Sequence, residues 1–381
     1  MADGSVQGFT DERHAPVRAA FEANLAGGAD VGAGFCATLE GETIVDLWGG
    51  YADAAKTRAW QKDTIVNVYS TTKTMTALTA LLLADRGELD FDAPVARYWP
   101  EFAASGKAGV KVRHVMSHAA GLSGWKEKIT TEDLYDWEKV TALLGAQAPL
   151  WEPGTASGYH AITQGYLVGE VVRRITGKSL GTVFREEIAE PLGADFHIGL
   201  PASEDARVAE LIPPPPGQGA GDGQQTEVQA ITFNNPGIDV SATRTRAWRG
   251  AEIPAAGGTG NARAVAEIHT ILANGGVAKG KRFMSEAGCR KALELQIEGQ
   301  DLVLGGPARF GMGFGLGGGV MPLPNPDDAM FWGGYGGSLV IIDMKARTTI
   351  SYAMNKMAGT TTGDMRAFGL AMAMWNGLGL V

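Results

Sequence analysis

The chain has 381 residues, with 33 basic and 42 acidic side chains and a formal net charge of −9. This length is enough for one large folded unit or two lobes, and a hydrophobic content of 45% excludes a disordered protein. The acidic balance, without a Lys/Arg-rich run, argues against nucleic-acid binding. Two cysteines, Cys36 and Cys289, cannot form a disulfide framework or a four-ligand zinc site, and we expect buried thiols.

The first residues are polar and acidic, and no apolar run reaches the about 20 residues that a membrane-spanning helix needs. We therefore expect no signal peptide, no membrane partner and a cytoplasmic location. Glycine is the unusual residue, with 54 copies, about twice the ordinary share. No repeat period accompanies these glycines, which excludes a collagen-like chain.

The N-terminal part of the chain is predicted to form strands. The β-favouring runs 34–39 and 43–48 flank a hairpin-type turn at 40–42. The period then changes, and the segment 74–84 predicts a helix that ends at Gly87. Because apolar residues cover most of its circumference, we expect this helix to be buried between layers.

Residues 95–250 mix helices with long loops, including helical patterns at 166–175 and 183–189 and a loop at 213–225 rich in Pro and Gly. The last third combines two helical patterns with three strand-like runs, namely helices at 261–274 and 368–375 and strands at 330–332, 338–343 and 348–354. Strands near both chain ends predict one sheet built from both termini. We expect a sheet domain of residues 1–65 and 255–381, and a mostly helical domain of residues 66–254.

The strongest chemical candidate is Ser70-Thr71-Thr72-Lys73, an S-x-x-K motif at the start of the predicted buried helix. The spacing i, i+3 puts the hydroxyl of Ser70 and the amine of Lys73 on one helix face. A partly dehydrated lysine loses basicity and can help to deprotonate a serine. The motif alone is weak, because about one match is expected by chance and a helix-capping serine explains it equally well. A second match at 123–126 lacks a following apolar helix and is interpreted as a loop coincidence.

The context of the motif is more specific. The stretch 68–102 resembles the active-site segment of penicillin-recognising serine hydrolases, closest to the class C β-lactamase-like branch. Three later segments continue the resemblance in order: 115–122 is similar to the family's L-x-H-T-S-G-L loop, 159–161 to its Y-x-N segment, and 332–338 to its K-T-G strand. The resemblance implies an α/β (α+β) fold of β-lactamase/transpeptidase type, with an antiparallel sheet flanked by helices, a helical insertion domain, and the active site between the two domains.

The resemblance also implies a role for each matching residue. Ser70 would be the acylated nucleophile, Lys73 its activator, and Tyr159 a phenolate-like general base that needs the positive charge of Lys73. The oxyanion hole would consist of the backbone N–H groups of Ser70 and Tyr335, the latter on an edge strand. Glycines near Tyr335 would open the wall of the cleft to the substrate. No metal or organic cofactor is implied.

Two departures from the family pattern narrow the range of expected substrates. Trp332-Gly333-Gly334 stands in place of Lys-Thr-Gly, and Ala161 in place of the Asn of Y-x-N. A tryptophan offers an apolar plate where the family's lysine holds a substrate carboxylate. The W-G-G-x-G-G-S and Y-H-A patterns resemble the family VIII carboxylesterases. On this resemblance Trp332, Gly333, Gly334 and His160 are expected to contact the substrate.

We therefore predict a serine hydrolase that cleaves small-molecule carboxylic esters of small to medium acyl chains. The alternatives are a weak β-lactamase or D-amino-acid peptidase, an acyltransferase of the same fold, and a non-enzymatic sensor module. Other motifs lack their context: the G-x-G-x-x-G at 313–318 is not followed by a helix pattern, and His114 and His118 lack the glutamate of a zinc protease.

Overall fold

The computed structural model describes residues 4–219, 222–237, 239–319 and 321–381. Two sequence expectations fall partly outside this range. Residues 1–3 belong to the N-terminal segment for which we expect no signal peptide. Residues 220–221 belong to the predicted Pro- and Gly-rich loop.

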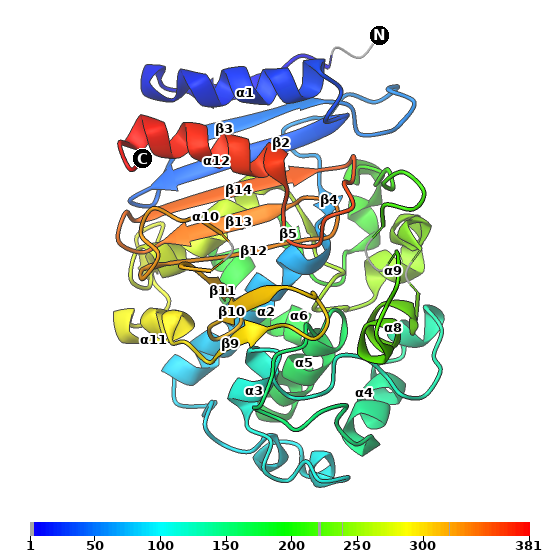
Figure 1. The fold of residues 1–381 in the computed structure, drawn as a ribbon. Coiled ribbons are helices and arrows are strands. Elements are labelled where there is room, and N and C mark those ends of the chain that lie inside the picture. Colours follow the sequence, from blue (N-terminus) through cyan, green and yellow to red (C-terminus); the bar gives the residue numbers. More distant parts are fainter. Residues whose placement is uncertain (1–3, 220–221, 238, 320) are drawn as a thin grey trace.

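An antiparallel sheet of nine strands forms one half of the molecule (Figure 1). Its order is β1-β3-β2-β14-β13-β12-β11-β10-β9. The predicted sheet built from both chain ends is confirmed, whereas the domain boundaries at 65/66 and 254/255 stay a prediction. The strands of this sheet are β1 (Gln7–Thr10), β2 (Gly32–Leu39), β3 (Glu42–Gly50), β9 (Ile297–Gln300), β10 (Pro307–Phe310), β11 (Gly315–Leu316), β12 (Ala329–Gly333), β13 (Leu339–Asp343) and β14 (Thr348–Met354).

The predicted hairpin between β2 and β3 is present, with Leu39 paired to Glu42 across a two-residue turn. Both turn residues, Glu40 and Gly41, have positive φ, at 52° and 90°. This backbone matches the right-handed twist of the paired strands, and glycine adopts it without steric cost.

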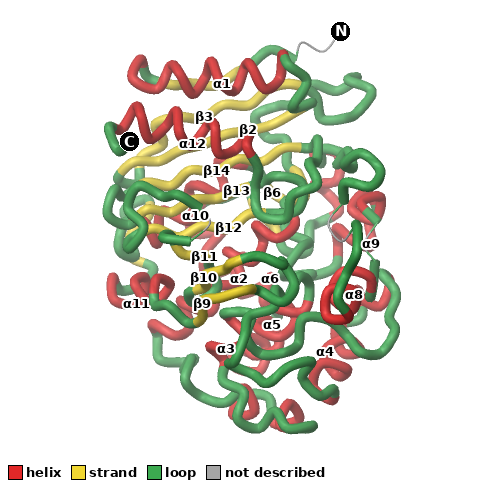
Figure 2. Tube along the Cα trace, viewed as in Figure 1, coloured by secondary structure: helices red, strands yellow, loops and turns green. Residues whose placement is uncertain are grey.

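Helices cover both faces of the sheet, and helices joined by long loops make up the other half (Figures 1 and 2). Helices α1 and α12 pack against each other on one face, and α10 packs against β2, β13 and β14 on the other. Within the described residues, every helix is too short or too polar to cross a lipid bilayer. The helices are α1 (Ala15–Ala26), α2 (Thr72–Asp85), α3 (Val112–Met116), α4 (Trp137–Ala146), α5 (Thr163–Thr176), α6 (Leu180–Phe184), α7 (Glu190–Leu192), α8 (Glu227–Asn234), α9 (Arg246–Gly250), α10 (Ala262–Ala273), α11 (Glu286–Arg290) and α12 (Met365–Leu378).

Helix α2 is the buried centre of the molecule. Its residues 72–83 are all buried, and it packs against α5, α6 and α11. The predicted burial between layers is confirmed, because neighbours surround the helix on all sides. The start of α2 lies beside a small sheet of β5 (Phe196–His197), β6 (Thr259–Gly260) and β4 (Val66–Asn67), which ties the segment before Ser70 to the segment after Gly258.

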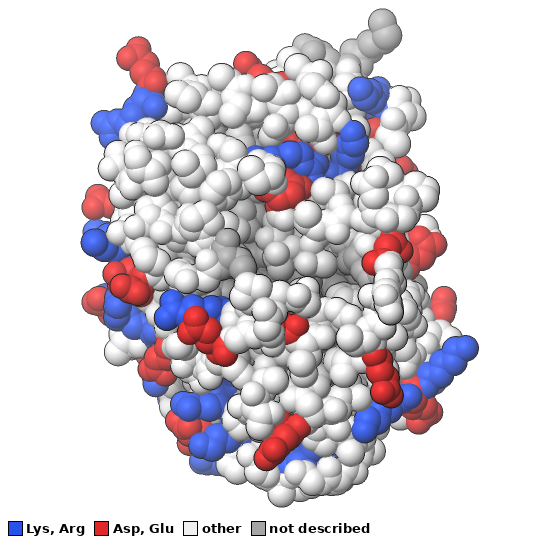
Figure 3. Space-filling model, viewed as in Figure 1, with Lys and Arg blue, Asp and Glu red and all other residues white. Residues whose placement is uncertain are grey.

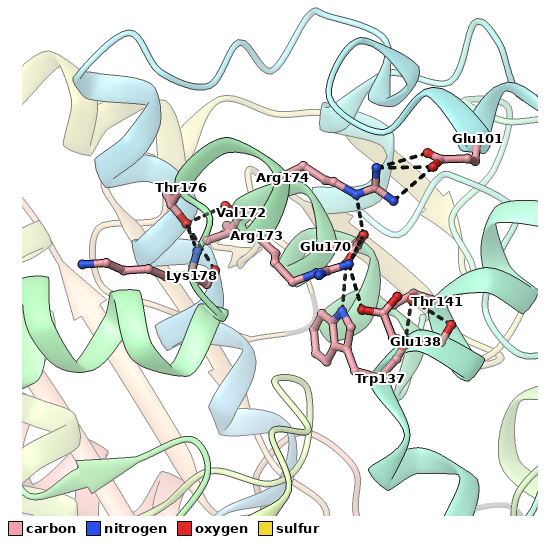
Figure 4. A network of polar contacts seen from close by, with 10 residues as sticks. All are labelled: Glu101, Trp137, Glu138, Thr141, Glu170, Val172, Arg173, Arg174, Thr176 and Lys178. Carbon is pink, nitrogen blue, oxygen red and sulfur yellow. Dashed lines mark hydrogen bonds and ion pairs between the residues drawn. The ribbon is translucent and has the colours of Figure 1, made fainter.

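A buried carboxylate joins α5 to α4 (Figure 4). Glu170, on α5, is 1% exposed and accepts hydrogen bonds from the Trp137 indole at 2.8 Å, from Arg173 at 2.8 Å and from Arg174 at 2.7 Å. Burial acts to raise the pKa of Glu170, but these hydrogen bonds outweigh it and the pKa is lowered. Glu170 is therefore expected to be ionised at neutral pH and to fix the position of α5, which follows the Tyr159 loop.

Replacement of Glu170 by alanine is expected to lower the free energy of unfolding by about 2–3 kcal/mol, because three donors lose a charged acceptor. Both arginines keep access to water, which moderates the loss. The matched control is Glu138→Gln, since Glu138 also pairs with Arg173 but is 76% exposed. This control should cost less than about 0.5 kcal/mol in urea unfolding. Equal losses in the two variants would contradict the assigned role of Glu170.

Candidate active site

Ser70 lies in a single 3-10 turn, Tyr69–Thr71, directly before α2. Tyr69 has a φ of +43°, which is strained for a bulky side chain. The Thr72 hydroxyl donates to the Tyr69 carbonyl at 2.5 Å and accepts from the Gly258 N–H at 2.9 Å. These contacts hold the strained turn, and Ser70 keeps an exposed fraction of 8%.

Three predicted residues meet at the Ser70 hydroxyl. The Tyr159 hydroxyl donates to Ser70 Oγ at 2.5 Å, and Lys73 Nζ lies 3.0 Å from the same oxygen. Lys73 Nζ also donates to the backbone carbonyls of Ala161 at 2.6 Å and Ala255 at 3.0 Å. The structure thus brings together Ser70, from the turn before α2, Lys73, from α2, and Tyr159, from a loop 89 residues after Ser70.

Burial determines the charge states of this group. It lowers the pKa of Lys73 well below the ordinary value of 10.5. It also raises the pKa of Tyr159 above the ordinary value of 10.0, and the nearby Ser70 and Trp332 side chains oppose this rise only in part. Both groups therefore favour their neutral forms. These directions run against a phenolate-like Tyr159 beside a charged Lys73, and the general-base role expected for Tyr159 stays a prediction.

A neutral Lys73 fits its surroundings well. An amine has two N–H groups, which match the two carbonyls of Ala161 and Ala255, and one lone pair, which is then left for the Ser70 hydroxyl. A lysine held in this way can accept a proton from the serine.

A small pocket of about 100 Å³ opens onto Ser70 and Tyr159. None of the described residues that line this pocket is charged. The other lining residues are Tyr69, Ala161, Ile162, Phe233, Pro236, Ala256, Tyr335 and Thr361. Figure 3 shows this face of the molecule hollowed between its two halves, with the charged side chains mostly around the hollow. The pocket is thus suited to an uncharged group.

A larger hollow, of about 640 Å³, lies beside the pocket without including Ser70. Thr360 and Thr362 line the hollow, whereas Thr361 lines the pocket of Ser70. The segment around Thr361 therefore lies between the two spaces. Size alone does not identify the reactive site here.

Tyr335 lies in the turn between β12 and β13 and lines the pocket. The expectation of an edge strand is corrected, because β12 lies between β13 and β11. Pairing with β11 covers only Met330 and Phe331, so it ends before Trp332 and leaves the turn beside the pocket. The oxyanion hole formed by the N–H groups of Ser70 and Tyr335 stays a prediction.

The glycines before Tyr335 serve close packing of the backbone. A Cβ at Gly334 would lie 2.1 Å from the Val68 carbonyl oxygen and 2.5 Å from Ser338 Oγ. A Cβ at Gly333 would lie 2.5 Å from the backbone nitrogen of Gly363. The expectation that these two glycines open the cleft to substrate is corrected, since protein backbone fills the space. Gly334 instead lets the end of β12 pack against Val68, which precedes Ser70, and Gly333 lets it pack against the backbone at Gly363.

Replacement of Gly334 by alanine is therefore expected to displace the turn that carries Tyr335. We expect a loss of about 1–3 kcal/mol in stability and a clear loss of turnover, because the new methyl group meets backbone that cannot rotate away. Gly369→Ala is the matched control, since a Cβ at this helical position meets nothing within 4 Å. We expect thermal unfolding to show that the control is as stable as the unchanged enzyme or slightly more stable, and its ester turnover should be unchanged.

Two further predicted contacts lie outside the pocket of Ser70. Trp332 is 4% exposed, and its ring packs 5.4 Å from the ring centres of both Tyr159 and Phe310. His160 is fully buried: its Nε2 accepts from the Leu122 N–H at 3.1 Å, and its Nδ1 lies 2.6 Å from the Gly158 carbonyl. The expected substrate contact of His160 is corrected, because both ring nitrogens bind backbone. Trp332 instead packs against the ring of Tyr159.

Several residues of the site could not be predicted from the sequence. The carbonyls of Ala161 and Ala255 hold Lys73, but a backbone acceptor leaves no signal in the residue type. Phe233, on α8, and Thr361 also line the pocket. Phe233 is one of several apolar residues of α8, so its residue type gave no signal that it lines the pocket.

The fold and the site are those of a serine hydrolase in which Ser70 directly precedes the helix that carries Lys73. The Beta-lactamase family model matches residues 17–372, so this chain belongs to the beta-lactamase family. The resemblance and the fold class predicted from the sequence are confirmed, and the chain is an enzyme of the serine hydrolase class.

Individual relatives are more specific. A crystal structure of a family VIII carboxylesterase superposes with a TM-score of 0.93 at 44% identity, covering 98% of this chain and 100% of that one. Esterase/beta-lactamase LipL of Mycobacterium tuberculosis is 36% identical over 374 residues, covering 92% of this chain and 83% of LipL. A class C beta lactamase from Rhodobacter sphaeroides shares the fold, with a TM-score of 0.64 at 17% identity over 96% of this chain and 98% of that one.

Proposed function

We propose that this protein is a carboxylesterase that cleaves small-molecule esters of small to medium acyl chains through an acyl-Ser70 intermediate. The observation that carries the proposal is the meeting of Lys73 Nζ and the Tyr159 hydroxyl at Ser70 Oγ, inside a small uncharged pocket. The relatives support the same reaction, since one is a family VIII carboxylesterase and another is the esterase/beta-lactamase LipL.

In the proposed acylation, the neutral Lys73 amine takes the proton of Ser70, and Oγ attacks the ester carbonyl carbon. The resulting oxyanion faces the backbone N–H groups of Ser70 and Tyr335. Tyr159 gives its proton to the leaving alkoxide as the carbon–oxygen bond breaks, and the alcohol departs. The Lys73 ammonium then returns a proton to Tyr159, so both groups regain their starting states.

Deacylation repeats the steps with water as the nucleophile. A water molecule loses a proton to Lys73 as its oxygen attacks the acyl carbon. The bond to Ser70 Oγ then breaks, and Tyr159 protonates this oxygen. Lys73 again restores the proton of Tyr159, and the carboxylic acid leaves.

The pocket also bears on substrate choice. Its volume of about 100 Å³ and its apolar lining favour short to medium acyl chains over long ones. A β-lactam or a peptide C-terminus presents a carboxylate, and no Lys or Arg is among the described residues that line the pocket surface. An uncharged ester avoids the cost of burying that carboxylate without a partner.

The proposal is tested with intact-mass measurements and turnover across matched substrates. We expect an acyl adduct on Ser70 with short-chain p-nitrophenyl esters, and higher kcat/KM for these esters than for nitrocefin. Nitrocefin turnover equal to ester turnover would favour the β-lactamase alternative, which the name of LipL also allows. A large rate gain with an added acceptor alcohol would favour an acyltransferase. The absence of any acyl adduct would favour a sensor module. The cytoplasmic location predicted from the sequence stays part of this proposal.

A further inference from the structure

A buried carboxylate outside the catalytic group holds the backbone of Tyr159. Asp301 follows β9, in the turn to β10, and is 2% exposed. Its Oδ1 accepts three backbone N–H groups, from Tyr159 at 3.0 Å, Val303 at 2.9 Å and Leu304 at 2.8 Å. Two of these donors belong to its own turn, and the third lies 142 residues earlier in the chain.

The turn that contains Asp301 is itself fixed to the loop of Tyr159. The Leu302 N–H donates to the Ser157 carbonyl at 2.8 Å, and the Asp301 N–H donates to the Gly306 carbonyl at 2.9 Å. From α8, the Gln229 side chain donates to the Val303 carbonyl at 3.0 Å. These contacts fix the 301–306 turn both to the loop that carries Tyr159 and to α8.

A turn of this kind needs the carboxylate only for its own N–H groups. The additional bond to the Tyr159 N–H serves no requirement of the turn, and it ends at the residue whose hydroxyl contacts Ser70. A carboxylate that accepts N–H groups forms hydrogen bonds about twice as strong as neutral ones. It is therefore well suited to fix a backbone position within a few tenths of an ångström.

We propose that Asp301 is a positioning residue for Tyr159, whose backbone it holds so that the phenol hydroxyl stays at Ser70 Oγ. The inference rests on the proposed function, because it assumes that Tyr159 transfers a proton. A displacement of about 1 Å of a reacting group can cost about 100-fold in rate, so loss of this support should affect turnover more than binding.

The first experiment compares Asp301→Ala, Asp301→Asn and a control on a short-chain p-nitrophenyl ester. Asp301→Ala should lower kcat by about 100-fold with little change in KM. Asp301→Asn keeps an acceptor oxygen and should recover part of this loss. The control is Asp343→Ala, since Asp343 is also a buried aspartate that accepts from a turn N–H, that of Ala346, at the opposite end of β13. It should keep the kcat of the unchanged enzyme.

A double-mutant cycle separates positioning from simple stabilisation. Tyr159→Phe alone should lower turnover by several orders of magnitude. If Asp301 acts through Tyr159, adding Asp301→Ala to Tyr159→Phe should lower kcat by less than about threefold more. Multiplication of the two losses would overturn the proposal, as would Asp301 variants that melt earlier but keep full kcat.

The outcomes also separate this inference from the proposed function. A fully active Tyr159→Phe enzyme contradicts the catalytic role of Tyr159, whatever Asp301 does. An inactive Tyr159→Phe enzyme together with fully active Asp301 variants overturns only the positioning role. If Asp301→Ala does not fold, Asp301→Asn carries the test, and a kcat equal to that of the unchanged enzyme overturns the proposal.

Discussion

Replacement of Ser70 by alanine is expected to lower ester turnover by about 10⁴–10⁶-fold, because the acyl-enzyme can no longer form. The fold should survive, since Ser70 lies in a turn held by other residues, Thr72 among them. The residual rate would come from the oxyanion hole and from substrate binding. Initial rates on a chromogenic short-chain ester measure the loss, and intact mass should show no adduct.

The sequence itself offers the control for this variant. Ser123 begins the second S-x-x-K match, is 1% exposed, and accepts a hydrogen bond from the Thr232 hydroxyl at 2.7 Å. Ser123→Ala should therefore keep full turnover with only a small loss of stability. Unchanged activity in the Ser70 variant, or an inactive Ser123 variant of normal stability, would contradict the assignment of the nucleophile.

The elements that could be predicted from the sequence are those with a strong local pattern. The run 74–84 is apolar on all sides, and α2 is indeed surrounded by other helices. The hairpin at Glu40-Gly41 and the strands β13 and β14 follow from turn residues and β-branched runs in the same way. The segment predicted as a helix at 183–189 begins earlier, at Leu180, because the Ser179 hydroxyl accepts the Thr182 N–H and caps α6.

The catalytic group could be predicted only by combining distant motifs. Ser70 and Lys73 share one turn, so their contact follows from spacing, but Tyr159 comes from another loop and was found by resemblance. Contacts made by backbone atoms could not be predicted, because Ala161 and Ala255 carry no side-chain signal. The same limit applies to Gly334, whose sequence context does not show that Val68 backbone occupies the space beside it.

The charge states of Lys73 and Tyr159 could not be predicted from the sequence either, because they depend on burial that no single motif specifies. The sequence suggested a charged Lys73 that sustains a phenolate. The structure instead places both groups where burial favours the amine and the phenol. For this reason we propose Lys73 as the base and Tyr159 as the acid in the first step.

Replacement of Lys73 by methionine is expected to lower turnover by about 10²–10⁴-fold, the range that the loss of a general base produces. Methionine has a similar unbranched shape, so the buried volume around α2 is largely kept. The hydrogen bonds to the carbonyls of Ala161 and Ala255 are lost as well, and some stability with them. Turnover should therefore be compared at a temperature where both proteins are folded.

The pH profile gives this prediction its sharpest test. Protonated Lys73 has no lone pair for the Ser70 proton, so kcat/KM should rise with pH as the lysine loses its proton. Because burial lowers the pKa of Lys73, this rise should lie well below pH 10.5. The two histidines beside the site do not account for a rise near neutral pH, since burial lowers the pKa of His160 to about 4 and that of His118 well below 6.5.

The residual activity of Lys73→Met should lack this rise, since no group titrates in place of the lysine. Lys73→Arg is the matching control, because a guanidinium stays protonated throughout the accessible range and should be inactive at every pH. A Met variant that keeps the same rise would assign the titration to another group, and an active Arg variant would exclude the amine as the base. Either result would move the proton acceptor from Lys73 to Tyr159.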